Sequence, residues 1–154
     1  MLKCLGPAST GKTMFAEALA APFRTGYVNN MILASGSNFA FSGNEMCSLI
    51  MMEEPQFVEP TGLEMLKPMA GNLCMVDSKN STHKTLFPSP ILVTTNRPEF
   101  VVNQAPEMAE AFRSRCITYR FRRKINEMPY RLTPEGLYRM LYLHNNYCFT
   151  DKEW

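Results

Sequence analysis

The amino-acid sequence predicts an α/β fold with a mostly parallel central sheet. Short apolar segments alternate with helix-forming segments along the chain. Several of the apolar segments are continuous rather than alternating, which is typical of strands buried on both faces. With 154 residues, 45% hydrophobic and 19% charged, the chain has the length and composition of one globular domain.

The first elements follow from local composition. Residues 1–5 are apolar and stop at a glycine, which predicts a buried strand. Residues 13–21 are rich in helix formers without Gly or Pro, and Pro22 ends that helix. We expect a second short strand within residues 26–30. Residues 34–44 are rich in Ser, Gly and Asn and predict a loop.

The middle of the chain alternates in the same way. Residues 46–52 form a continuous apolar segment closed by two glutamates, which predicts a strand buried in a parallel sheet. Residues 61–67 predict a short helix that ends at Pro68. The polar segment at 72–87 fits a hairpin or an extended loop, and residues 91–95 are strongly β-prone.

The remaining elements are shorter or amphipathic. Residues 107–113 predict a short helix, and residues 116–121 alternate like a strand. A last helix is expected over residues 134–144, with Thr133 as its N-cap and Pro134 in its first turn.

A phosphate-binding loop lies between the first strand and the first helix. The segment matches the pattern G-x-x-x-x-G-K-S/T without a gap. Glycines let backbone N–H groups converge on a phosphate, the helix N-terminus adds partial positive charge, and the lysine reaches the outer phosphates. The threonine hydroxyl can bind Mg²⁺. The predicted nucleotide-binding residues are Gly6, Pro7, Ala8, Ser9, Thr10, Gly11, Lys12 and Thr13.

Two later strands end in polar residues that suit the same site. A buried strand delivers Glu53 and Glu54 to the carboxyl edge of the sheet, where ligands bind in such folds. We assign Glu53, with Thr13, to the metal and Glu54 to the attacking water, although the two roles can be exchanged. Asn96 follows the predicted strand at 91–95 and can contact the outer phosphate or the water; an ordinary turn residue is the competing interpretation.

Basic residues form two further groups. Arg115 lies between a helix and a strand, where it can reach a neighbouring subunit's nucleotide. Arg120, Arg122, Arg123 and Lys124 are interpreted as a solvated basic surface. The polar segment before the predicted strand at 91–95 contains Lys79, His83 and Lys84. These residues can either bind a phosphate backbone or be ordinary surface residues.

The overall totals constrain the class of protein only loosely. A net charge of +2 neither requires nor excludes a nucleic-acid partner. The five cysteines contain no CxxC pair, which favours reduced thiols. No apolar segment is long enough to span a membrane, and no membrane partner is expected. A strand at residue 1 suggests a piece of a longer polypeptide.

At this point the chain resembles the superfamily 3 helicases of small DNA viruses, and most of all the helicase domain of parvovirus large nonstructural proteins. Five segments carry the resemblance over roughly residues 1–123. They are GPASTGKT at 6–13, PFRTGYVNN and NFAFSGN within 22–44, LIMMEEP at 49–55, the run from Asp77 to PSPILVTTN at 88–96, and FRSRC at 112–116.

The resemblance implies a P-loop NTPase of AAA+ type with a β-hairpin inserted before the sensor 1 strand. It implies an ATP- and Mg²⁺-dependent helicase that unwinds DNA during viral replication in the host cell nucleus. Residues 1–124 would be the ATPase core and 125–154 a C-terminal helical segment of the same domain. Asn96 would be sensor 1, Arg115 the arginine finger, and Lys79 a hairpin contact to DNA.

The implied partners are single-stranded and duplex DNA and further copies of the chain. Full-length relatives would form a ring, expected to be a hexamer, and this chain alone is expected to be a monomer. The sequence departs from the family pattern at Ala70, where a glycine is usual, at Ser81, where a second lysine is usual, and at Met51 and Met52, where aromatic residues are common.

Two other functions fit parts of the sequence. A P-loop kinase of a small metabolite would share the phosphate loop and use the basic residues 113–124 as a lid. A nucleotide- or DNA-binding module without turnover of its own is the second alternative. The acidic pair followed by the Thr-Thr-Asn strand argues against the kinase and favours the helicase.

Overall fold

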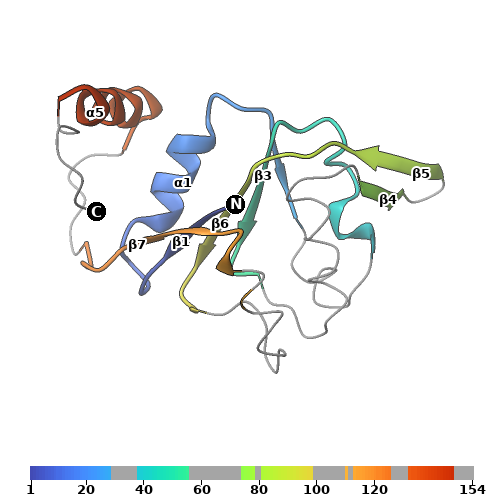
Figure 1. Ribbon diagram of the computed structural model, residues 1–154, viewed down its shortest axis with the longest axis horizontal. Helices are drawn as coiled ribbons and strands as arrows, with labels where there is room; N and C mark the ends of the chain where they lie inside the picture. The colour runs from blue at the N-terminus through green and yellow to red at the C-terminus, as the bar shows by residue number, and fades with distance from the viewer. Residues whose placement is uncertain are drawn as a thin grey trace.

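A five-stranded parallel sheet forms the centre of the computed structural model (Figure 1). The structure describes residues 1–28, 38–55, 74–78, 81–98, 110, 113–125 and 132–147. The strand order in the five-stranded sheet is β2-β3-β6-β1-β7, and every neighbouring pair is parallel. The strands are β1 (Leu2–Leu5), β2 (Thr25–Tyr27), β3 (Leu49–Glu53), β6 (Ile91–Thr95) and β7 (Ile117–Arg120).

The strand order decides which loops meet at the carboxyl edge. β6 lies between β1 and β3, and the register pairs Leu5 with Thr95 and Glu53 with Thr94. The ends of these three strands therefore lie level with one another. The loop after β1, the acids that end β3 and the polar end of β6 share one edge, as ligand-binding residues do in open parallel sheets.

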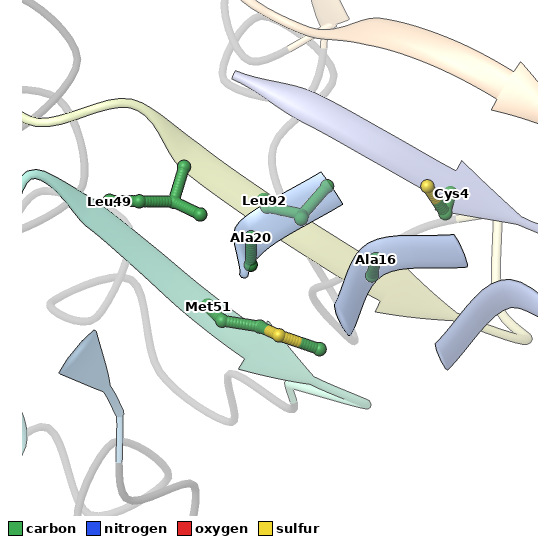
Figure 2. Packing of buried hydrophobic residues seen from close by; sticks show 6 residues of the cluster. All are labelled: Cys4, Ala16, Ala20, Leu49, Met51 and Leu92. Atoms are coloured by element: carbon green, nitrogen blue, oxygen red, sulfur yellow. The ribbon is translucent and has the colours of Figure 1, made fainter. Parts of the chain in front are cut away.

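Helix α1 (Lys12–Ala20) covers one face of the sheet. It turns Ala16 and Ala20 onto Cys4, Met51 and Leu92, all of which are almost fully buried (Figure 2). Alanine at the contact lets the helix backbone come close to the strands, and the large side chains of the sheet fill the space between them. The fold class predicted from the sequence, a P-loop α/β domain with a mostly parallel sheet, is confirmed.

Helix α5 (Pro134–Tyr147) packs beside α1. The Tyr138 hydroxyl donates to the carbonyl of Leu19 at 2.7 Å, and Leu137 is fully buried. The hydroxyl oxygen of Thr133 accepts from the N–H of Gly136 at 3.1 Å, so Thr133 caps the helix as predicted. The helix extends three residues beyond the predicted end, because no Gly or Pro interrupts residues 145–147.

A second, two-stranded sheet stands at the opposite end of the molecule from α5 (Figure 1). It consists of β4 (Cys74–Ser78) and β5 (Ser81–Leu86), which pair antiparallel, with a register shift between Val76 and Ser78. Leu86, at the end of β5, is 1% exposed and anchors this strand to the rest of the domain.

Two boundaries differ from the sequence prediction. The predicted loop at 34–44 contains a 3-10 helix, η1 (Asn38–Phe41), and there Ala40 and Phe41 are buried. The predicted strand at 46–52 begins only at Leu49, because the N–H of Cys47 bonds the carbonyl of Asn44 in a turn and leaves Met46 67% exposed.

Some predictions fall outside the described residues. The helix expected at 61–67 lies outside them, and of the helix expected at 107–113 only Glu110 and Arg113 are described, both helical. None of the helices in the described ranges is long and apolar enough to cross a membrane.

Candidate nucleotide-binding site

The loop after β1 has the backbone of a phosphate cradle. Gly11 has φ 81° and Ser9 φ 61°, both left-handed conformations that curl the chain tightly. The Thr10 hydroxyl donates to the carbonyl of Pro7 at 2.9 Å and closes the curl from inside. Thr10 is 3% exposed, so this bond is sheltered from water. The backbone conformation and this internal bond therefore define the curl of the loop.

Helix α1 begins where this loop ends. Its N-cap is Gly11, which has no side chain to bond the first N–H groups, and its first turn contains no acid. These N–H groups and the helix dipole therefore favour an anion at this end. The first helical residue is Lys12, which adds a full positive charge at the same point.

The root of the loop is fixed by the last residue of β6 and by the residue that follows β7. Gly6 donates its N–H to the carbonyl of Thr95 at 3.1 Å, and Phe121 donates to the carbonyl of Leu5 at 2.8 Å. A Cβ on Gly6 would overlap the carbonyl oxygen of Phe121, so only glycine fits at this close approach.

Lys12 ties the loop to β6. Lys12 is buried, with 6% of its surface exposed. Its Nζ donates to the carbonyl of Pro7 at 2.7 Å and to Oδ1 of Asn96 at 2.8 Å. These two acceptors are neutral oxygens, which compensate a buried ammonium less than an anion does. The lysine is thus held in the site and keeps an unneutralised charge for an anionic ligand.

Thr13 and Glu53 meet across the sheet edge. The Thr13 hydroxyl donates to Oε1 of Glu53 at 2.8 Å. A hydroxyl and a carboxylate oxygen at this separation are the hard donors that Mg²⁺ binds through one or two protein groups and several waters. The two residues assigned to the metal from the sequence therefore lie together.

Glu54 turns in a different direction from Glu53. Its backbone is left-handed, with φ 44°, an uncommon conformation for a residue that carries a Cβ. Its Oε2 accepts from the N–H of Asn96 at 3.1 Å and from the Thr95 hydroxyl at 3.4 Å, while its own N–H bonds the carbonyl of Thr94 at 2.8 Å. The two consecutive acids thus have different partners. Glu53 bonds a residue of α1, and Glu54 bonds residues at the end of β6.

A hollow of about 280 Å³ opens beside the loop. Residues Ser9 to Met14 line it together with Ile125, whose N–H donates to the carbonyl of Ser9 at 2.8 Å. The segment after β7 therefore runs along the outside of the phosphate loop and adds an apolar wall to the hollow.

Arg115 lies away from this site. Arg115 precedes β7, and the first residue of β7, Ile117, is level with Leu2 at the amino edge of the sheet. The carbonyl of Arg115 accepts from the terminal amine of Met1 at 3.1 Å. The side chain is exposed. Arg115 therefore lies at the edge opposite its own phosphate loop. The basic residues interpreted as a solvated surface, Arg120, Arg122, Arg123 and Lys124, are exposed as predicted.

The residues predicted to contact DNA are only partly described. Lys79 lies outside the described residues, and so does the side chain of His83, although its backbone belongs to β5. The side chain of Lys84 is 51% exposed and lies 3.6 Å from Oε1 of Glu45. Burial opposes the charged form of Glu45, but N–H bonds from Glu45 and Gly43, together with the Lys84 charge, lower its pKa overall.

The thiols and acids of the described residues do not indicate a second centre. Burial raises the pKa of Cys4 to about 11, an effect that the charge of Lys12 partly offsets, and burial also raises the pKa of Cys116. These two thiols stay neutral at physiological pH. Among the described residues, no group of three or more His, Cys, Asp or Glu side chains is arranged to hold a metal ion.

Sequence reasoning missed three residues of this site. Thr95 bonds Glu54, Phe121 packs on Gly6, and Ile125 lines the hollow. The β-prone stretch before Asn96 contained the signal for Thr95, because strand alternation places every second residue on one face. The other two contacts join residues more than a hundred positions apart, and no local pattern reports them.

Comparison with known proteins identifies the family to which the chain belongs. A family model described as parvovirus non-structural protein NS1 matches residues 2–145. Initiator protein NS1 of Hamster parvovirus H1 is 30% identical over 125 residues, and that of Parvovirus LuIII is 31% identical over 117 residues. The matches cover 78% and 73% of this chain but 18% and 17% of those proteins, so the chain spans less than a fifth of their length.

Two solved structures share the fold. The apo NrS-1 C-terminal region matches with a TM-score of 0.59 at 14% identity, over 93% of this chain and 34% of that one. The JCV helicase matches with a TM-score of 0.50 at 20% identity, over 80% and 35%. The family inferred from the sequence is confirmed: the chain belongs to the parvovirus non-structural protein NS1 family, and it shares the fold of the JCV helicase.

Proposed function

We propose that this chain is the ATP-hydrolysing motor domain of a viral DNA replication helicase. The observation that carries the proposal is the meeting of three strand ends at one edge. Lys12 bonds Asn96 at 2.8 Å, Thr13 bonds Glu53 at 2.8 Å, and Glu54 accepts from the N–H of Asn96 at 3.1 Å. This arrangement supports a site in which Lys12 supplies a cation, Thr13 and Glu53 a metal-binding pair, and Glu54 a base around one phosphate cradle.

The residues fit a magnesium nucleotide. The left-handed turns at Ser9 and Gly11 and the uncapped start of α1 direct N–H groups toward a phosphate. Lys12 would exchange the neutral oxygens of Pro7 and Asn96 for phosphate oxygens, a stronger partner for an ammonium. Thr13 and Glu53 would hold Mg²⁺, which when bound neutralises the charge that develops on the phosphates.

Glu54 would act on the water that attacks the outer phosphate. The Asn96 N–H and the Thr95 hydroxyl already fix its carboxylate, so the base is oriented before a ligand arrives. Once Lys12 moves to the phosphates, the Asn96 amide oxygen loses that donor and can accept from the same water. Asn96 would then link phosphate contact to the position of the base.

Assembly and DNA contact extend the proposal beyond one chain. Arg115 lies at the sheet edge opposite its own loop, so it would complete the site of a neighbouring copy rather than its own. Lys84, whose side chain is 51% exposed, would exchange its ion pair with Glu45 for a DNA phosphate, and Lys79 and His83 would supply further contacts to DNA. The relatives' printed name, initiator protein, supports a replication role over a metabolite kinase.

Steady-state ATP turnover, with and without single-stranded DNA, tests the proposal. We expect turnover per chain to rise with protein concentration, because the arginine acts in trans. Lys12→Ala should lower turnover by about 10²–10³-fold, the usual effect of removing a preorganised charge donor. Arg139→Ala, an exposed residue on α5, is the matched control and should match the wild type.

The same assay separates the two parts of the proposal. Arg115→Ala should still bind nucleotide but lose the rise of turnover with concentration. If Lys12→Ala retains normal turnover, the site assignment is wrong. If wild-type turnover per chain is independent of concentration, the phosphate site stands but the role of Arg115 does not.

A further inference from the structure

Thr94 carries a polar atom that the fold leaves unsatisfied. Its Oγ1 is the single buried side-chain oxygen or nitrogen without a hydrogen-bond partner among the described residues, and the residue is 1% exposed. Buried hydroxyls in folded proteins nearly always have a partner, so an exception requires an explanation. A partner that arrives with a ligand is one explanation, and the position of Thr94 supports it.

Strand register places Thr94 next to Glu53. In the sheet it pairs with Glu53 on one side and with Cys4 on the other. Leu92 and Met51, two residues earlier on β6 and β3, face α1 together with Cys4 (Figure 2). Because side chains alternate along a strand, Thr94 and Glu53 also face α1, at the level where that helix begins.

The surroundings of Thr94 belong to the proposed metal site. Glu53 accepts from the Thr13 hydroxyl through Oε1, at the start of α1. The charge of Lys12 acts on the Cys4 thiol, the other register partner of Thr94. Thr94 thus lies between β1, which leads into the phosphate loop, and β3, which ends in Glu53.

We propose that Thr94 is a positioning residue for the Glu53 carboxylate in the state loaded with magnesium and nucleotide. This inference rests on the proposed function. A carboxylate that binds a metal through one oxygen is oriented by hydrogen bonds to the other, and such outer partners commonly change metal affinity by about 10–100-fold. The Thr94 hydroxyl donates that bond once the carboxylate turns toward the metal. In the structure the Thr94 hydroxyl has no hydrogen-bond partner.

The test uses Thr94→Val and Thr94→Ser in the same chain. Valine keeps the shape and removes the hydroxyl, whereas serine keeps the hydroxyl. The affinity for a fluorescent ATP analogue is measured over a range of Mg²⁺ concentrations, Mn²⁺ binding is followed by electron paramagnetic resonance, and the thermal unfolding midpoint is recorded without ligand. None of these readouts requires turnover.

We expect Thr94→Val to bind nucleotide normally without metal and to need about tenfold more Mg²⁺ for the metal-dependent gain in affinity. Its ligand-free unfolding midpoint should be equal to or above that of the wild type, because an unsatisfied hydroxyl has been removed. Thr94→Ser should keep the wild-type Mg²⁺ dependence.

Two results would overturn the inference while the proposed function stands. One is a wild-type Mg²⁺ dependence in Thr94→Val. The other is a lowered unfolding midpoint without ligand, because the hydroxyl would then have a structural partner. A wild-type chain that shows no metal-dependent nucleotide binding overturns the proposed function itself, and this inference with it.

Discussion

The two edges of the five-stranded sheet are made from the same strands but have opposite chemistry. At the carboxyl edge, Lys12, Thr13, Glu54 and Asn96 take part in hydrogen bonds that join α1, β3 and β6. At the amino edge, an apolar hollow of about 460 Å³ is lined by Leu2, Leu49, Ile91 and Ile117, which begin β1, β3, β6 and β7.

β6 makes this change within a few residues. Ile91, Leu92 and Val93 are buried and apolar, whereas Thr94 and Thr95 are equally buried but polar, and Asn96 is exposed. The first half of the strand contributes packing energy. Its second half and the following Asn96 hydrogen-bond Glu54 and Lys12, the residues to which we assign chemistry. Stability and chemistry are therefore separable by position along a single strand, which mutations can test.

The largest expected effect is at the carboxyl edge. Glu54→Gln keeps the size of the side chain and an acceptor oxygen for the Asn96 N–H but removes the base. We expect ATP turnover to fall by about 10²-fold or more with nucleotide affinity nearly unchanged, because general base catalysis acts on the chemical step. Single-turnover hydrolysis and equilibrium binding measure the two quantities. A parallel loss of affinity would assign Glu54 to ground-state binding instead.

A smaller effect is expected on the apolar part of β6. Leu92 is 1% exposed beneath α1, so Leu92→Ala should lower the free energy of unfolding by about 2–5 kcal/mol. Turnover per folded molecule should change little. Chemical denaturation and active-site titration measure both.

Asn96→Ala, four positions further along the chain and directly after β6, is the matched variant. It should retain nearly normal stability, because Asn96 is exposed, and should lose turnover. If Leu92→Ala reduced turnover per folded molecule as strongly as Asn96→Ala, packing and chemistry on β6 would not be separable.

The carboxyl edge could be predicted from the sequence because its signals are contiguous. The loop at 6–13, the acids that close β3 and Asn96 after β6 each follow directly from an apolar strand, and parallel strands bring such ends together. β6 was predicted with its observed bounds, because Pro90 and Asn96 flank a β-branched segment. Local chemistry was sufficient wherever a motif and a strand end coincided.

The contacts that complete the site could not be predicted in this way. Phe121 closes on Gly6, and the N–H of Ile125 bonds the carbonyl of Ser9, each pair far apart in sequence. The left-handed backbone at position 54 also had no sequence signal, because the residue there is neither Gly nor Asn, which commonly adopt this conformation. These features arise from tertiary packing, which individual segments do not report.

A crystal structure with Mg²⁺ and a non-hydrolysable ATP analogue tests the central claim most directly. We predict that the triphosphate lies in the loop at residues 6–13, that Lys12 Nζ leaves Asn96 for a phosphate oxygen, and that the metal lies beside Thr13 and Glu53. A nucleotide bound elsewhere, or one bound while Lys12 remains on Asn96 and no metal lies beside Glu53, would contradict the account.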